Sequence, residues 1–124
     1  MVYNREVENF FSNTYSQSRE LFLRSVPAEA QVTSFEHPQK GPQGESLFVD
    51  VAVLGDKSSD KALVHIVGTH GVEAFAGAAI QQSIFAELKK RSSQKLPKMI
   101  FVHPINPFGM AWLRRGNQNN VDLN

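Results

Sequence analysis

Residues 63–75 read LVHIVGTHGVEAF, and the rest of the chain is organised around this stretch. The apolar run at residues 63–67 predicts a strand, and the glycine-flanked turn GTHG at 68–71 leads into a predicted helix whose first turn carries Glu73. In an open α/β sheet, the carboxyl ends of the strands face the crevice where ligands bind. We therefore expect His70 and Glu73 to point toward a ligand and not into the core.

His70 and Glu73 are three positions apart, a spacing that brings two side chains to one face of a helix. Zinc is bound by imidazole nitrogen and carboxylate oxygen, and two histidines plus one glutamate with an open fourth position form a known catalytic set. The pair would supply two of these three ligands. The pattern H-x-x-E is common, however, and a histidine after a strand is often a hydrogen-bonded turn residue, so both interpretations stay open at this point.

Composition excludes several classes of protein. The chain has 124 residues, of which 20% are charged, and this size corresponds to one compact domain. A net charge of +1 gives no electrostatic reason to expect nucleic acid or an anionic membrane as a partner, and the absence of cysteine excludes disulfides, thiolate metal sites and a cysteine nucleophile. The N-terminus is charged where a signal peptide needs an apolar core, and no apolar run approaches the about 20 residues of a membrane span. We expect a soluble, cytoplasmic protein.

The first third of the chain is predicted to serve packing. Apolar residues recur at helical spacing over residues 5–24, which predicts one amphipathic helix that ends before Pro27. Residues 31–36 alternate enough to suggest a short strand, and residues 37–45, which contain two prolines and two glycines, suggest a loop. His37 is expected to be a solvated residue of that loop and not a ligand.

The centre of the chain predicts a sheet. Residues 46–54 and 62–68 are apolar runs joined by a turn, so we expect them to pair as a hairpin, with helices covering each side of the sheet. His65, inside the second run, is expected to be a core residue. The helix after the GTHG turn is expected to bury the stripe Val72, Phe75, Ala76, Ala79, Ile80, Ser83 and Ile84.

A further strand is predicted at residues 98–105. The order strand, helix, strand over residues 62–105 implies a crossover that makes its two strands parallel. The predicted fold class is therefore α/β, with helix, sheet and helix layers and a mixed, partly parallel sheet.

The tail, residues 103–124, is rich in Asn, Gly and Pro and follows the end of a strand, so it is expected to be a loop beside the same crevice. One interpretation is a surface loop with turn chemistry. Against it, Arg114 and Arg115 lie close in sequence to Trp112, where one guanidinium could be held rigidly and present several donors to a carbonyl or carboxylate.

Four features in order along the chain resemble a known family: GTHGVE at 68–73, NPFG at 106–109, the arginine at 115, and VDLN at 121–124. Together they resemble the zinc carboxypeptidase superfamily of the carboxypeptidase A type, and most closely a bacterial branch known mainly as a domain of unknown function. The opening pattern also resembles that branch, at Phe11, Tyr15, Arg19 and Phe22. The resemblance implies a zinc exopeptidase-like fold.

The resemblance also implies roles for particular residues. His70 and Glu73 match the first two zinc ligands. Asp122 matches the carboxylate that orients the ligand His70, and Arg115 matches the arginine that polarises the scissile carbonyl and stabilises the oxyanion. Arg115 is preferred to Arg114 because it lies seven positions before Asp122.

Substrate binding is implied for two residues of the tail. Asn124 matches the asparagine that, with a following arginine, holds the terminal carboxylate of a substrate. Arg114 is the alternative arginine and is assigned to the substrate side with Asn124.

The implied reaction is hydrolysis of a C-terminal peptide or related amide bond, with a small peptide or N-acyl amino acid as substrate and Zn²⁺ as cofactor. The alternatives are a deacylase or amidase acting on N-acyl amino acids or cell-wall peptides, and a non-catalytic fragment. The family's third zinc ligand and its general base have no counterpart in residues 1–124. We therefore expect the N-terminal portion of a catalytic domain that is inactive by itself. The sequence does not indicate an oligomeric state.

Overall fold

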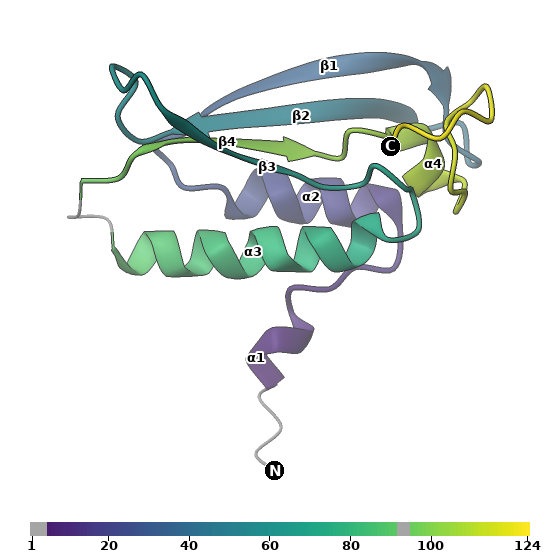
Figure 1. Ribbon diagram of the computed structural model, residues 1–124. Coiled ribbons are helices and arrows are strands. Elements are labelled where there is room, and N and C mark those ends of the chain that lie inside the picture. Colours follow the sequence, from purple (N-terminus) through teal and green to yellow (C-terminus); the bar gives the residue numbers. More distant parts are fainter. Residues whose placement is uncertain (1–4, 92–94) are drawn as a thin grey trace.

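The computed structural model describes residues 5–91 and 95–124. The elements are, in chain order, α1 (Arg5–Glu8), α2 (Tyr15–Ser25), β1 (Gln31–Lys40), β2 (Ser46–Leu54), β3 (Ala62–Ile66), α3 (Ala74–Lys90), β4 (Lys98–His103) and α4 (Pro107–Ala111). The strands form one sheet in the order β1-β2-β4-β3, and the long helices α2 and α3 lie side by side against it (Figure 1). The short helix α4 lies at the end of the sheet where the chain also ends (Figure 1).

The predicted fold class is confirmed. β1 with β2 and β2 with β4 pair antiparallel, whereas β3 and β4 pair parallel. The helix that connects the two parallel strands is α3, as the order strand, helix, strand predicts. The result is a mixed, partly parallel sheet with helices, as in a zinc exopeptidase-like fold. The expectation that helices cover each side of the sheet is wrong for the described residues, since α2 and α3 lie on the same face (Figure 1).

The predicted hairpin between β2 and β3 is wrong, because β4 lies between these strands. In the sheet, Val51 of β2 pairs with Val102 of β4, and Val64 of β3 pairs with Ile100 of β4. β4 is the more buried of the two candidates for the inner place, since four of its six residues are buried, whereas β3 has four of five exposed. A strand that is apolar on both faces is most stable inside a sheet, so β4 takes the inner position although it comes last in the chain.

Three aromatic rings join the helices to the sheet. The ring of Phe85, on α3, lies 5.5 Å from that of Phe22 on α2 and 4.9 Å from that of Phe101 on β4, measured between centroids. All three rings are fully buried and pack with Ala52 and Leu54 of β2. Tilted and edge-on aromatic pairs add to the free energy gained by burying their surface, so this cluster fixes both helices on one face of the sheet.

The helix predicted over residues 5–24 is two helices, since α1 ends at Glu8 and α2 begins at Tyr15. Thr14 is the N-cap of α2, and its side chain accepts a hydrogen bond from the backbone N–H of Gln17 at 3.2 Å. Threonine is favoured at such a cap because its hydroxyl satisfies an N–H that has no partner within the helix. The cap at Thr14 therefore starts a new helix, although the apolar spacing continues across residues 5–24.

The face of α3 that packs on the core differs from the predicted stripe. Val72 and Ile80 are 53% and 55% exposed. The buried residues of α3 are Ala74, Ala78, Ala79, Gln81, Gln82, Phe85 and Leu88. Two glutamines on the core face obscure the apolar periodicity, and one of them, Gln81, is held there by hydrogen bonds to His103 and to the carbonyl oxygen of Val102.

The sheet face opposite α2 and α3 is rich in apolar residues. Val64 and Ile66 of β3 are 54% and 52% exposed, and Phe35 of β1 is 57% exposed.

The described helices are too short or too polar to span a lipid bilayer.

Candidate metal centre

The turn after β3 brings His70 and Glu73 together. Gly68 has φ +78°, a left-handed conformation that glycine adopts without steric cost, and a Cβ there would lie 2.7 Å from the Cβ of Pro104. Glu73 is the N-cap residue of α3, so the pair lies in the turn before the helix. The prediction that Glu73 lies in the first turn of the helix is therefore wrong. The two side chains nevertheless converge, with His70 Nδ1 3.1 Å from Glu73 Oε2.

The other ring nitrogen of His70 contacts the tail of the chain. His70 Nε2 lies 2.9 Å from Oδ1 of Asp122. The second oxygen of Asp122 accepts a hydrogen bond from Arg115 Nε at 3.0 Å. Glu73, His70, Asp122 and Arg115, all selected from the sequence, thus form one continuous series of contacts. The His70 side chain is 16% exposed, whereas those of the other three are 43% to 66% exposed, so the series lies at the molecular surface.

The environment of Asp122 makes its carboxylate an acceptor for Nε2 of His70. Oδ1 of Asp122 also accepts a hydrogen bond from the backbone N–H of Asn124 at 3.0 Å. This bond, together with those from His70 and Arg115, lowers the pKa of Asp122 to about 2. The carboxylate is therefore ionised at neutral pH and acts only as an acceptor. Nε2 of His70 therefore faces this acceptor, whereas Nδ1 faces the carboxylate of Glu73.

This donor set fits a cation. A neutral imidazole has a single N–H and can donate to only one of two carboxylates. Since Asp122 takes that N–H, Nδ1 and the Glu73 carboxylate, 3.1 Å apart, need a positive charge between them, which is either a second proton on the ring or a metal ion. Imidazole nitrogen and carboxylate oxygen are both zinc ligands, and a carboxylate on the second ring nitrogen is the usual partner of a ligating histidine.

The pair is not a complete metal site by itself. Within residues 5–91 and 95–124, no three histidine, aspartate, glutamate or cysteine side chains are grouped closely enough to hold a metal ion. The described residues thus bring together two candidate ligands, His70 and Glu73, and place Asp122 on the other ring nitrogen of His70.

The two arginines of the tail have different partners. Arg115 contacts Asp122, whereas Arg114 donates to Oδ1 of Asn120 at 3.2 Å and lies outside the series that contains His70. The guanidinium of Arg114 lies over the ring of Phe108, 5.8 Å from its centroid.

Trp112 has a different role from the one predicted. Its indole N–H donates to the carbonyl oxygen of Lys40 at 3.1 Å, and its ring stacks on Phe108 at 5.7 Å. Arg114 of the tail thus lies over the ring of Phe108 and not over that of Trp112. The indole instead ties the tail to the end of β1.

The backbone N–H of Asn124 donates to Asp122, which places this exposed residue next to the series of contacts. No hydrogen bond of its side chain is found among the residues that the structure describes.

Sequence reasoning missed Gly71. Its N–H donates to the carbonyl oxygen of Arg114 at 3.1 Å, which ties the His70 turn to the arginine pair. A Cβ at this position would lie 1.9 Å from the carbonyl carbon of Gly109 and 2.4 Å from the carbonyl oxygen of Arg114. Only glycine fits this approach, and the glycine directly after His70 was the available signal.

The remaining histidines lie elsewhere. His37 is part of β1, which continues to Lys40, so the prediction of a loop histidine is wrong; its Nε2 lies 3.3 Å from Oε1 of Gln118. His65 is half-buried on β3, contacts Gln81, and has its pKa lowered by burial. His103 is fully buried, and burial lowers its pKa to about 4.

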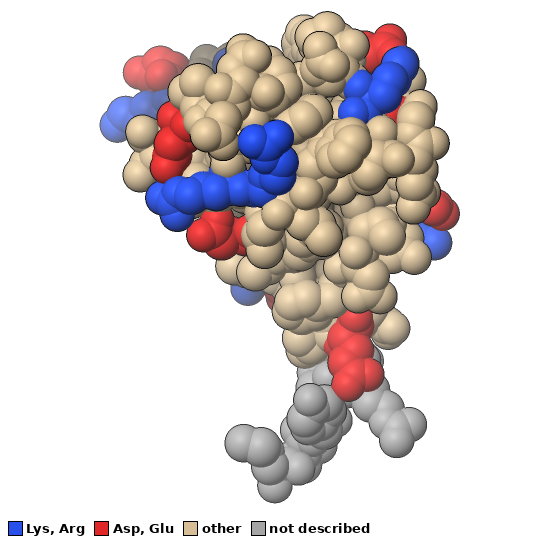
Figure 2. Space-filling view, turned by 90° about the vertical axis from the view of Figure 1, so that its right-hand side faces the viewer, with Lys and Arg blue, Asp and Glu red and all other residues tan. Residues whose placement is uncertain are grey.

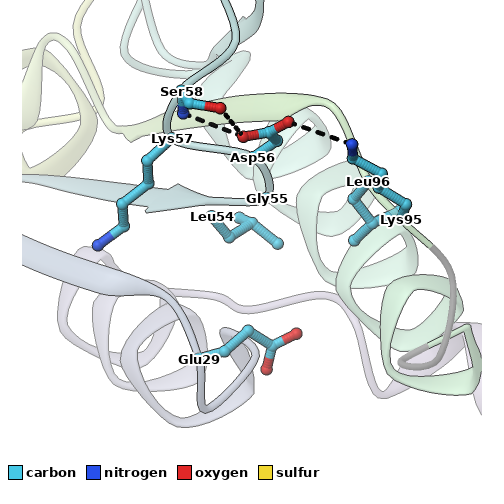
Figure 3. A pocket seen from close by; sticks show the side chains of 8 residues that line it. All are labelled: Glu29, Leu54, Gly55, Asp56, Lys57, Ser58, Lys95 and Leu96. Atoms are coloured by element: carbon cyan, nitrogen blue, oxygen red, sulfur yellow. Dashed lines mark hydrogen bonds and ion pairs between the residues drawn. The ribbon is translucent and has the colours of Figure 1, made fainter.

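Figure 2 shows the end of the molecule that carries α4 and the tail. Positively and negatively charged side chains lie next to one another there on a largely uncharged surface (Figure 2). A hollow of about 540 Å³ lies at the other end of the sheet, where β2 ends and β4 begins (Figure 3). Its Asp56 is bonded to Ser58 and paired with Lys95 at 3.7 Å, and His70 is not among the residues that line it.

Comparisons with known proteins support the fold described above. A family described as "Protein of unknown function (DUF2817)" matches residues 11–124. No curated protein matches the chain. The crystal structure of Tannerella forsythia glutaminyl cyclase is similar, with a TM-score of 0.51, 11% sequence identity, and 87% of this chain and 43% of that chain covered. The chain thus spans less than half the length of that enzyme, and at this identity the likeness concerns the fold alone.

Proposed function

The chain belongs to the DUF2817 family of proteins of unknown function, and from this premise we propose that it is a zinc-dependent hydrolase of the metallocarboxypeptidase type. The proposed reaction is cleavage of a C-terminal peptide bond or related amide bond in a small peptide or N-acyl amino acid. The observation that carries the proposal is the imidazole of His70 placed between two carboxylates, those of Glu73 and Asp122.

The proposed metal ligands are His70, through Nδ1, and Glu73. Zinc bound there would supply an activated water and would polarise an amide carbonyl. Asp122 keeps the proton of His70 on Nε2, which leaves Nδ1 available as a ligand and makes it more basic. This division of roles follows from the contacts on the two ring nitrogens.

The proposed role of Arg115 is to donate N–H groups to the oxygen that becomes negative when an amide carbonyl is attacked. Donors that are held in place before the reaction stabilise such charge without reorganising. The bond from Nε to Asp122 holds the guanidinium by one edge. Arg115 is 64% exposed at its side chain, so a substrate can reach its other nitrogens.

A second candidate is a chain that binds metal weakly and does not catalyse. It is favoured by the lack of a third ligand near His70 and Glu73 among the described residues. Deacylase or amidase activity on N-acyl amino acids or cell-wall peptides is a variant of the first proposal, since the same groups would act on a different amide.

Zinc binding tests the site. The affinity of the 124-residue chain for Zn²⁺ is measured by competition with a chromophoric chelator, for the wild type, for His70→Ala and for His37→Ala as the matched control. We expect one bound zinc per chain, an affinity at least about tenfold lower in His70→Ala, and no change in His37→Ala. Equal affinity in all three proteins would reject the assignment of His70.

Turnover separates the candidates. The chain is incubated with a panel of peptides and N-acyl amino acids, with and without a chelator, and the products are identified by mass spectrometry. Chelator-sensitive release of a C-terminal residue supports the carboxypeptidase proposal, and cleavage of N-acyl amino acids alone supports the amidase variant. Weak zinc binding without turnover of any substrate supports the second candidate.

A further inference from the structure

Asn106 lies between β4 and α4 and is 1% exposed. Its backbone N–H donates to the carbonyl oxygen of Gly68 at 3.1 Å, and its side-chain oxygen accepts the N–H of Gly109 at 2.9 Å, which caps α4. The cap uses only the oxygen of the side chain. The amide nitrogen is available for other partners.

The amide nitrogen of Asn106 bridges two segments of the candidate site. Nδ2 lies 3.4 Å from the carbonyl oxygen of Thr69 and 3.4 Å from the carbonyl oxygen of Arg115. Thr69 directly precedes His70 in the chain. One buried side chain thus contacts the backbone of the turn that carries the proposed zinc ligand and the backbone of the residue that carries the proposed oxyanion donor.

Only an amide satisfies all of these partners. An Asn side chain has one acceptor oxygen and two N–H donors, which matches one N–H and two carbonyl oxygens. A carboxylate of the same shape could still accept from Gly109 but would place negative charge against both carbonyls. The fit also depends on Gly109, because a Cβ there would lie 2.4 Å from Nδ2.

We propose that Asn106 is a positioning residue that sets the spacing between the His70 turn and Arg115. That spacing allows Asp122 to accept from both side chains at once, at 2.9 Å and 3.0 Å. The catalytic meaning of this role rests on the proposed function, whereas the bridge exists without metal or substrate.

The variant that isolates the role is Asn106→Asp. It keeps the oxygen that caps α4 and removes both donors to the carbonyls. Asn106→Ser, which keeps a cap oxygen without a charge, replaces it if circular dichroism shows that Asn106→Asp is unfolded. The matched control is Thr14→Ala, which removes the cap of α2 on an element that does not carry the site.

The measurement is NMR of the metal-free chain at fixed pH. The ¹⁵N shifts of the His70 ring report the hydrogen bonds at its two nitrogens, and the exchange rate of the Arg115 Nε–H reports its bond to Asp122. In Asn106→Asp we expect changed ring ¹⁵N shifts and Nε–H exchange about tenfold faster or more, because the bonds to Asp122 open, whereas Thr14→Ala keeps both signals of the wild type. Wild-type signals in Asn106→Asp, or equal changes in Thr14→Ala, would overturn the proposal.

Zinc titration of the same variants separates this inference from the proposed function. The expected NMR changes together with weaker zinc binding support both. The same NMR changes with unchanged zinc affinity support the positioning role of Asn106 and count against His70 as a zinc ligand.

Discussion

The Nε2 atom of His70 lies 2.9 Å from Oδ1 of Asp122, although 52 positions separate the two residues in the chain. The contact forms because the tail returns past the turn after β3, where the N–H of Gly71 holds the carbonyl oxygen of Arg114. A local pair, His70 and Glu73, thereby acquires a partner from the far end of the chain.

Replacing Asp122 by Asn should weaken zinc binding by about 10-fold to 100-fold. An amide can donate to Nε2 of His70, which would move the ring proton to Nδ1, the proposed metal-binding atom. Chelator competition measures the effect, and the exposed Asp60→Asn variant is the control for loss of one negative charge. Unchanged affinity in Asp122→Asn would show that this carboxylate does not orient a ligand.

Where the panel yields a substrate, replacing Arg115 by Ala should lower kcat on it by about 100-fold while leaving zinc affinity nearly unchanged. The reason is that Arg115 would act on the developing charge and not on the metal. Arg114→Ala is the matched comparison, because its guanidinium bonds to Asn120. A larger fall of kcat in Arg114→Ala would exchange the roles of the two arginines.

Replacing Gly71 by Ala should lower the free energy of unfolding by about 2 to 3 kcal/mol and also weaken zinc binding. The new Cβ would overlap the backbone of Gly109 and Arg114, which cannot move aside as a flexible side chain can. Gly44→Ala is the control: its φ is +81° and its surroundings are open, so it should cost only about 1 kcal/mol and leave zinc binding intact. Urea unfolding of both variants measures the difference, and equal losses would contradict the close packing at Gly71.

Stability should fall as the pH is lowered from about 6.5 toward 4, because of His103. Burial lowers its pKa from 6.5 to about 4, so in this range the unfolded chain takes up a proton that the folded chain does not. The free energy of unfolding should decrease by up to about 3 kcal/mol across the range and should show no further decrease from this group below it. The charges of Asp50 and Arg19 act on His103 in opposite directions, the first raising and the second lowering its pKa.

Urea unfolding at a series of pH values measures this dependence. His103→Asn removes the titrating group, so its stability should change less with pH over the same range. A variant with the same pH dependence as the wild type would show that another group causes it.

Much of the candidate site could be predicted because its signals are local. His70 and Glu73 are three positions apart beside glycines, and the seven-position spacing of Arg115 and Asp122 survives as a direct contact at 3.0 Å. The hydrogen bond from Trp112 to the carbonyl oxygen of Lys40 could not be predicted, because the two residues are 72 positions apart.

The polar contacts inside the core could not be predicted from the sequence either. Oε1 of Gln81 lies 3.0 Å from Nδ1 of His103, and Oγ of Ser18 lies 3.2 Å from Nε2 of the same ring. Glutamine and serine suggest an exposed surface when they are read along a helix. They are buried here because each finds a partner on another element, which removes the cost of burying an unpaired polar group.

The amino-acid sequence by itself determined the strands, the turn that carries His70 and the partly parallel character of the sheet, because these depend on apolar spacing, glycine and the order of neighbouring elements. Only the tertiary structure decided that β4 lies between β2 and β3, and that Asn106 bonds to the backbone of both Thr69 and Arg115. Those features depend on which buried groups satisfy one another across the whole chain, and spacing along the sequence does not contain that information.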